Sequence, residues 1–140
     1  VQADPTDDHA LTRLALAYWH MDNQKAAQDA AQKALTLLDN TLSQRLTDEP
    51  LYRSRRSLIL AILGKTQEAK AELNRTRTLP LCHFCPYSSC KDADIYEAQI
   101  EEILGNTEKA QKLYTAGRAK WPDDLDCIAG ELRLKKKGRK

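Results

Sequence analysis

The sequence contains few of the residues that interrupt regular structure, with five glycines and five prolines among 140 residues. Charged residues make up 30% of the chain and apolar residues 41%, a balance typical of a soluble, largely helical protein. No apolar run approaches the ~20 residues that a membrane-crossing helix needs. The N-terminus also lacks the basic and then apolar pattern of a secretion signal. We therefore expect a single domain with no membrane partner.

The sequence also lacks a recognisable catalytic cluster. Its three histidines, His9, His20 and His83, have no evident nucleophile to pair with. His9 and His20 are eleven positions apart, which on one helix is too far for both to hold one metal ion. Because no set of residues fits the usual catalytic roles, we expect a protein that is not an enzyme.

Basic residues are concentrated at one end of the chain. The last eight residues hold six of the 22 lysines and arginines and none of the 20 acidic residues. The rest of the chain is therefore slightly acidic, which argues against a broad nucleic-acid surface. The basic tail could touch phosphate, but no aromatic residues interleave it, so a solvated helix end is the simpler interpretation. We expect no direct nucleic-acid binding by this chain.

Apolar residues recur at helical spacing along most of the sequence, beginning with Leu11, Leu14 and Tyr18. Asp92 and Asn106 stand where helix N-caps are expected. The cysteine-rich segment is the one stretch that does not have a helical pattern. The pattern predicts helices at about 8–21, 24–46, 50–63, 66–79, 92–104, 106–120 and 124–136.

The pattern repeats at intervals of 42 and 41 residues. Each copy has an alanine early in its second helix and a small residue twelve positions before it, and two copies have a glycine five positions before that alanine. Small residues at matched places let antiparallel helices pack closely. The matching positions are Ala15 and Ala27; Ser57, Gly64 and Ala69; and Ala98, Gly105 and Ala110.

This series of small and large residues resembles the tetratricopeptide repeat (TPR) family over about residues 8–122, and Pro122 lies where that family places its closing proline. The resemblance implies an all-α fold: a right-handed superhelical stack of antiparallel helix pairs, that is, a TPR-like α-solenoid with a C-terminal capping helix. One domain would span 1–140. Its parts would be units at about 8–39, 50–80 and 91–122, a cysteine-rich loop at 81–91, and the capping helix with the basic tail at 124–140.

The chain departs from the family pattern in several places. Its repeats are longer than the family's usual ~34 residues, and Asp39 replaces the closing proline of unit one. In unit two, Arg53 and Arg56 stand where the family has apolar residues. Unit two is therefore the least similar to the family.

The resemblance implies a concave groove lined by the first helix of each pair, where the family usually binds peptides or partner helices. No asparagine occurs on these helices, so a clamp of paired Asn and Lys for a terminal carboxylate is not expected. The groove is predicted to be mostly apolar, and the same residues could instead pack against a missing N-terminal domain or a second copy in a homodimer. Carried over by spacing, the groove residues are His9, Thr12, Leu16, Trp19, His20, Ser54, Leu58, Ala61, Ile62, Ile95, Gln99, Glu102 and Ile103.

Three cysteines within nine residues, Cys82, Cys85 and Cys90, could share one tetrahedral Zn²⁺. Cys127 is a better fourth ligand than His83, because residues adjacent in sequence rarely point at one metal. Disulfides and reduced buried thiols are the alternatives. Four protein ligands would leave no open position, so the zinc would be structural. Zinc-bound thiolates would fit the reducing cytoplasm, where we expect the protein.

Two functions remain open. The first is a non-catalytic scaffold that presents its groove to a protein or peptide. The second is the C-terminal ligand-sensing and dimerisation half of a bacterial helix-turn-helix transcription regulator. The run LCHFCPYSSCKDADIYEAQ followed by WPDDLD resembles C-terminal stretches of such regulators. In that case the DNA-binding part would lie outside this chain.

Overall fold

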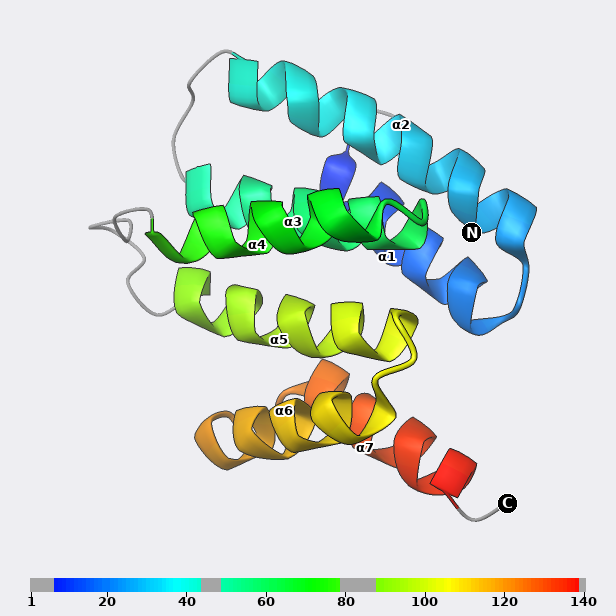
Figure 1. Cartoon of the computed structure of the whole chain (residues 1–140), viewed down its shortest axis with the longest axis vertical. Coiled ribbons are helices and arrows are strands. Elements are labelled where there is room, and N and C mark those ends of the chain that lie inside the picture. The colour runs from blue at the N-terminus through cyan, green and yellow to red at the C-terminus, as the bar shows by residue number, and fades with distance from the viewer. Residues whose placement is uncertain (1–6, 44–48, 79–87, 139–140) are drawn as a thin grey trace.

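The computed structural model describes residues 7–43, 49–78 and 88–138, and within these ranges all regular structure is helical. The all-α prediction is thus confirmed for the described part of the chain. No helix in these ranges has the length and apolarity that a bilayer crossing requires. The helices are α1 (Asp8–His20), α2 (Gln24–Ser43), α3 (Glu49–Ile62), α4 (Thr66–Thr78), α5 (Ser88–Ile103), α6 (Thr107–Lys120) and α7 (Leu125–Gly138) (Figure 1).

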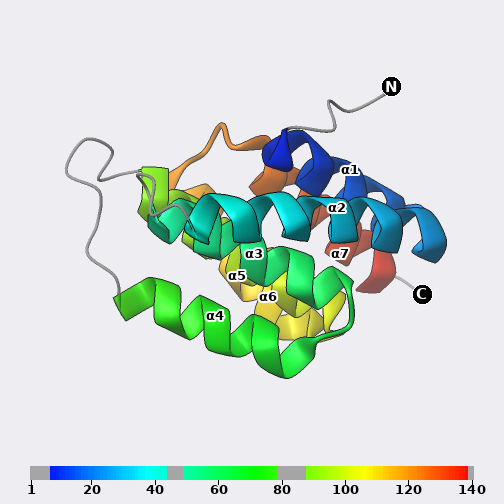
Figure 2. The same ribbon diagram turned by 90° about the horizontal axis from the view of Figure 1, so that it is seen from above.

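Consecutive helices pack in pairs: α1 with α2, α3 with α4, and α5 with α6, with α7 packed on α6. Figure 1 shows these pairs following one another along the long axis of the molecule, from α2 at the top to α6 and α7 at the bottom. The first helices of the pairs also contact one another, because α3 lies against both α1 and α5. Seen from above, α4 lies at one edge of the molecule and α1 at the opposite edge (Figure 2). Residues of α1, α3 and α5 therefore share one side of the molecule.

The small residues that repeat in the sequence lie where the paired helices meet. All six are at most 1% exposed: Ala15, Ser57 and Ala98 on the first helices, and Ala27, Ala69 and Ala110 on the second helices. A larger side chain at these positions would push the two helices apart, because close-packed interiors have no room for extra methylene groups. The predicted steric role of the repeat is confirmed.

One type of turn joins the two helices of each pair. In the second and third pairs, Gly64 (φ 81°) and Gly105 (φ 84°) adopt the left-handed conformation that glycine tolerates best. The following amide donates to the carbonyl five residues back, as in Lys65 N to Leu60 O at 2.9 Å. Asp22 (φ 59°) occupies the same place in the first pair, and the next residue makes the same bond. The same turn thus recurs in all three helix pairs.

The core consists of two clusters that meet at α5. The larger cluster draws its buried residues from α1 to α4 and includes Ile100 of α5. The smaller cluster lies between α5, α6 and α7 and surrounds Tyr114, whose side chain is fully buried. Gly130 of α7 faces the Tyr114 ring so closely that a Cβ atom there would lie 2.4 Å from Cζ. A residue without a side chain is therefore needed where α7 crosses the ring.

Ion pairs account for the two arginines that depart from the family pattern. Glu72 of α4 accepts hydrogen bonds from Arg53 at 2.7 Å and from Arg56 at 2.8 Å, and its side chain is only 9% exposed. Arg56 also donates to Asp39 of α2 at 2.7 Å. Charge pairing here joins α2, α3 and α4 at positions where apolar packing is expected in the family.

Two details of the predicted boundaries are wrong. Helix α5 begins at Ser88, so the segment 88–91 belongs to the helix and not to the cysteine-rich loop, and Asp92 lies inside the helix instead of capping it. No proline or glycine stands between Pro86 and residue 92, so no helix-breaking residue delays the start of the helix to that position. Asn106 does occupy the N-cap position of α6, but its side chain makes no capping bond and donates to Glu101 at 2.6 Å instead.

Candidate functional site: a polar pocket between the first helices

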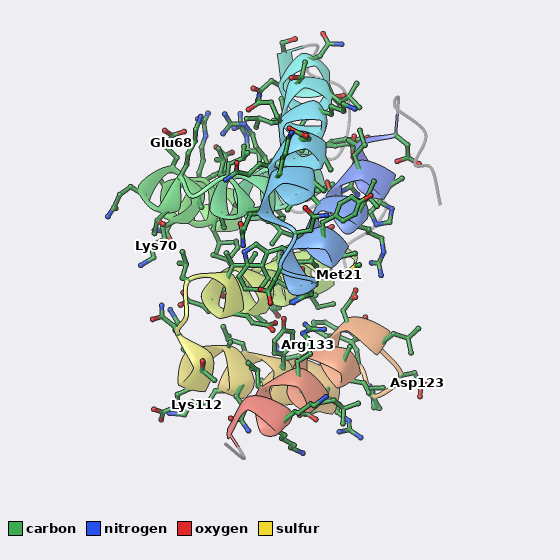
Figure 3. The ribbon with its side chains drawn as sticks, turned by 90° about the vertical axis from the view of Figure 1, so that its right-hand side faces the viewer. Met21, Glu68, Lys70, Lys112, Asp123 and Arg133 are labelled. Atoms are coloured by element: carbon green, nitrogen blue, oxygen red, sulfur yellow. The ribbon has the colours of Figure 1, made fainter. Side chains whose placement is uncertain are left out.

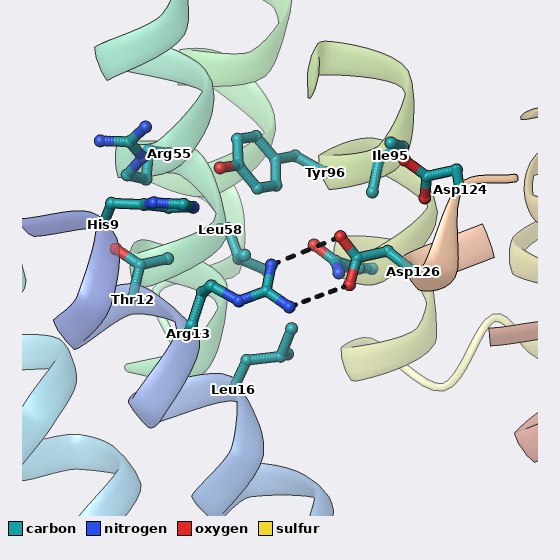
Figure 4. Close-up of a pocket in the computed structure, with 11 residues that line it drawn as sticks. His9, Thr12, Arg13, Leu16, Arg55, Leu58, Ile95, Tyr96, Asp124 and Asp126 are labelled. Atoms are coloured by element: carbon teal, nitrogen blue, oxygen red, sulfur yellow. Dashed lines mark hydrogen bonds and ion pairs between the residues drawn. The ribbon is translucent and has the colours of Figure 1, made fainter. Parts of the chain in front are cut away.

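A pocket of about 190 Å³ lies between α1, α3, α5 and the beginning of α7 (Figure 4). Helices α1, α3 and α5 each contribute side chains about one turn apart, because residues three or four positions apart share a helix face. Asp124, in the turn before α7, and Asp126, in the first turn of α7, form an acidic side of the same pocket. The lining residues are His9, Thr12, Arg13, Leu16, Arg55, Leu58, Ile95, Tyr96, Gln99, Asp124 and Asp126.

Six of the residues carried over by the TPR spacing line this one pocket: His9, Thr12, Leu16, Leu58, Ile95 and Gln99. They come from three helices that are far apart in the sequence and that the fold brings together. The repeat spacing therefore located the face on which the pocket lies.

The remaining predicted groove residues lie outside the pocket lining. Ser54 and Ile62 are buried at 0% and 4% exposure, and Ala61 is buried with them. Trp19 and Ile103 are half-buried and pack against the larger core cluster. Glu102 belongs to a separate group of polar side chains described below, and His20 Nδ1 lies 4.0 Å from its carboxylate.

Five lining residues were not predicted from the sequence: Arg13, Arg55, Tyr96, Asp124 and Asp126. Because four of them are charged side chains, the expectation of a mostly apolar groove is wrong for this part of the molecule. Helical spacing could have predicted Arg13, Arg55 and Tyr96, since each lies three or four positions from a predicted groove residue on the same helix. No such signal existed for the two aspartates, because Asp124 lies in the turn between α6 and α7 and Asp126 in the first turn of α7, outside the three helices predicted to line the groove.

Arg55 is buried at 8% exposure and forms an ion pair with Asp8 of α1. Its guanidinium also lies 5.7 Å from the centre of the Tyr52 ring, within the range of a cation–π contact. Burial opposes the charge, but the interactions with Tyr96 and Asp8 outweigh it, and the pKa of Arg55 lies above its ordinary value. The pocket therefore contains a fixed, buried positive charge.

Two buried atoms in the pocket have no hydrogen-bond partner among the residues that the structure describes: Arg55 Nε and Gln99 Oε1. Gln99 is only 4% exposed. Leaving a buried donor or acceptor unsatisfied costs about 1–3 kcal/mol, so such atoms are uncommon inside proteins. Both residues line the pocket, although these two atoms themselves are buried.

Arg13 of α1 and Asp126 of α7 form an ion pair across the pocket (Figure 4). The two guanidinium nitrogens lie 3.5 Å from the two carboxylate oxygens, and the Arg13 side chain is 60% exposed. An exposed pair of this kind contributes about 0–1 kcal/mol. The pair connects the first and last described helices, and a ligand could displace it at little cost.

Glu102 organises the polar group that lies deeper in the stack. Its carboxylate, whose side chain is 1% exposed, accepts hydrogen bonds from Arg133 of α7 at 2.9 and 3.0 Å and from the Tyr114 hydroxyl at 2.8 Å. Figure 3 shows Arg133 pointing from α7 towards α5. Burial alone would raise the pKa of Glu102, but the hydrogen bonds from Arg133 and Tyr114 lower it below its usual range. Glu102 therefore links α5 to α6 and α7 through buried hydrogen bonds.

The four cysteines are not all within the described part of the chain. Cys82 and Cys85 lie outside it, and the side chain of Cys90, although the residue is in α5, is also outside it. Cys127 is 1% exposed within the smaller core cluster, with its Sγ atom 2.8 Å from where a Cβ of Gly117 would lie. The described side chains include no group of three metal-binding residues. Structural zinc at the four cysteines remains a prediction.

Comparison of the chain with protein-family models, with curated proteins and with solved structures found no match. The pocket and its chemistry are accordingly the basis for a functional proposal. It combines a buried guanidinium, an unsatisfied amide oxygen, two aspartates and an aliphatic wall, a combination suited to binding a polar group of a ligand.

Proposed function

We propose that this chain is a TPR-like α-solenoid, a right-handed superhelical stack of antiparallel helix pairs, that binds a protein or peptide non-catalytically. Its binding surface is the face formed by α1, α3 and α5. Three observations support the repeat architecture: the shared turn at Asp22, Gly64 and Gly105, the buried small residues at matching positions, and the pairwise packing of the helices.

The single observation that carries the binding proposal is the pocket itself, which is lined by side chains from three first helices and from the segment 124–126. It opens on the face where first helices of successive pairs meet, which is where a partner can touch several pairs at once. Leu16, Leu58 and Ile95 form an aliphatic wall of the pocket, and its charged residues can orient a bound group. Apolar surface with a few placed polar groups is the usual composition of a recognition site.

Selection from a random peptide library against the immobilised protein tests this proposal. The selected peptides are then measured on two variants with the same substitution, Leu16→Arg in the pocket and Leu132→Arg on α7. Leu132 is 63% exposed and outside the pocket, so it is a matched control for the added charge and bulk. Circular dichroism verifies that both variants keep their helix content.

We expect Leu16→Arg to weaken peptide binding by about tenfold or more, since a buried anchor residue is typically worth over 1 kcal/mol. Leu132→Arg should leave the affinity unchanged. Selection of no peptide, or equal binding to both variants, would reject the pocket face as a peptide-binding surface.

A further inference from the structure

We infer that two copies of this chain associate through the outward face of α7, with the two α7 helices antiparallel across a twofold axis. The surface consists of four apolar residues, called the α7 stripe below: Leu125, Ile128, Ala129 and Leu132. None of them lines the pocket, so the inference does not depend on the proposed peptide binding.

The α7 stripe runs along one side of the helix. Its members are spaced by three, one and three positions, which places them on one helix face. Leu125 is 78% exposed and Leu132 is 63% exposed, and the two residues between them are partly exposed. The opposite side of α7, which includes Cys127 and Leu134, is buried in the smaller core cluster. The helix therefore has one apolar side in the core and a second one in contact with solvent.

An apolar outward face is unusual at the end of a helical stack. The terminal helix of a repeat array normally has a polar outer face, because no further repeat covers it. Here α7 packs on α6 and α5 and lies along the lower edge of the molecule in Figure 3. Leu125 and Leu132 are two of the three large apolar side chains that are exposed in the described part of the chain. Single exposed apolar residues are common, but aligned ones indicate a contact surface.

The α7 stripe is complementary to itself. A twofold axis between residues 128 and 129 would place Leu125 of one copy level with Leu132 of the other copy, and the same contact would recur on the other side of the axis. Ile128 would meet its own counterpart near the axis. Ala129 is small, so it allows the two helices to approach closely there. The two ends of the α7 stripe are the same residue type, which suits a contact between identical surfaces.

Charge favours the antiparallel orientation. Asp123, Asp124 and Asp126 lie where α7 begins, whereas residues 132–140 hold six bases and no acid. Two bases near the acidic end are already in ion pairs within the chain. Two antiparallel helices would place the acidic end of each beside the basic end of the other, so opposite charges would meet twice. A parallel pair would bring like charges together at both ends.

Asp123 and Lys136 are the residues through which this orientation can be tested. Both are exposed, and Figure 3 shows Asp123 at the end where α7 begins. In the register given above, Asp123 of one copy is level with residue 134 of the other copy. Lys136 of that copy is therefore within about one helical turn, which a lysine side chain can span.

The size of the contact predicts a weak dimer. The 14 residues of α7 extend over about 21 Å. One such helix against its copy buries less than the ~800 Å² per partner of a standard stable interface. We expect a dissociation constant of roughly 10–100 µM, so that monomer and dimer exchange in solution.

Sedimentation velocity with a reductant present, at protein concentrations from about 1 µM to about 1 mM, tests the inference. The wild-type chain should change from monomer to dimer in this range. Leu132→Arg places a charge at both ends of the contact and should weaken dimerisation at least about tenfold. Met21→Arg is the matched control, because Met21 is 71% exposed and lies at the end of α1, away from α7. It should dimerise like the wild type, and circular dichroism verifies the helix content of both variants.

Charge reversal tests the orientation. Asp123→Lys alone, or Lys136→Glu alone, would turn two attractions into two repulsions and should weaken the dimer about threefold or more at low salt. The chain that carries both changes should recover the wild-type dissociation constant to within about twofold. In a parallel dimer each of these residues would face its own counterpart, and neither single change would weaken association.

A wild-type chain that stays monomeric at about 1 mM would overturn the inference and leave the α7 stripe to a different protein. Dimerisation of Leu132→Arg equal to that of the wild type would also overturn it, because the contact would then lie elsewhere. Single charge variants that dimerise as well as the wild type, or no recovery when they are combined, would reject the antiparallel arrangement. The peptide affinity of Leu132→Arg is a separate readout of the pocket, so failure of either proposal leaves the other standing.

Discussion

Gly130→Ala is the substitution for which the structure predicts the most specific outcome. An added Cβ would lie 2.4, 2.5 and 2.6 Å from three ring carbons of Tyr114, whereas carbon atoms prefer about 3.5–4.0 Å. The ring cannot move aside, because it is fully buried and its hydroxyl donates a hydrogen bond to Glu102 at 2.8 Å. Overpacking of this kind costs about 1–3 kcal/mol. Alanine's higher helix propensity offsets about 1 kcal/mol of that loss.

We therefore expect Gly130→Ala to lower the free energy of unfolding by up to about 2 kcal/mol, measured by urea denaturation. The decisive comparison is the same substitution in a Tyr114→Leu background, where the ring is absent. There Gly130→Ala should be neutral or stabilising by up to about 1 kcal/mol, because only the propensity gain remains. An equal change in the free energy of unfolding in both backgrounds would refute the proposed contact.

Two other predictions concern a turn and an acid-sensitive carboxylate. Asp22→Gly should stabilise the protein by about 0.5 kcal/mol, because glycine adopts the observed φ of 59° without strain. Asp22→Ala should destabilise it, because alanine in the left-handed region is strained. Thermal melts that rank the two variants the other way would contradict this prediction. The pKa of Glu102 is lower in the folded protein than its usual ~4.3, so its stabilising contribution is complete above about pH 5 and is lost as pH falls through the folded pKa. Between about pH 5 and 3, the free energy of unfolding should therefore fall less steeply in Glu102→Gln than in the wild type; equal slopes would show that Glu102 does not supply the acid sensitivity.

Much of the face that carries the pocket could be predicted because helical periodicity is a local property. His9, Thr12 and Leu16 lie three and four positions apart, so any helix through them must place them on one side. Matching spacing in the later repeats placed Leu58, Ile95 and Gln99 on the same face. The charged partners were missed because the family pattern supplies packing positions and does not include the side chains that pair with them.

The ion pair between Glu102 and Arg133 could not be predicted from the helical spacing of the repeat. Glu102 lies at a groove position by its register on α5, yet its carboxylate is fully occupied by α6 and α7. Arg133 belongs to the basic end of the chain, which the sequence indicated to be a solvated helix end. The difference arises because α7 packs back on α6 and brings this one base into the stack.

The sequence by itself determined the helices, their pairing and the repeat. The features that specify them are the spacing of apolar residues, the small residues and the turn residues, and each of these depends on only a few neighbouring positions in the chain. That Asp22 forms the same turn as Gly64 and Gly105 was found only in the structure, because the sequence has no glycine at that place in the first pair. Only the tertiary structure decided that Asp124 and Asp126 close the pocket opposite Arg55. Their position depends on how successive helix pairs are rotated and displaced, and this depends on packing across the whole stack and not on any local pattern.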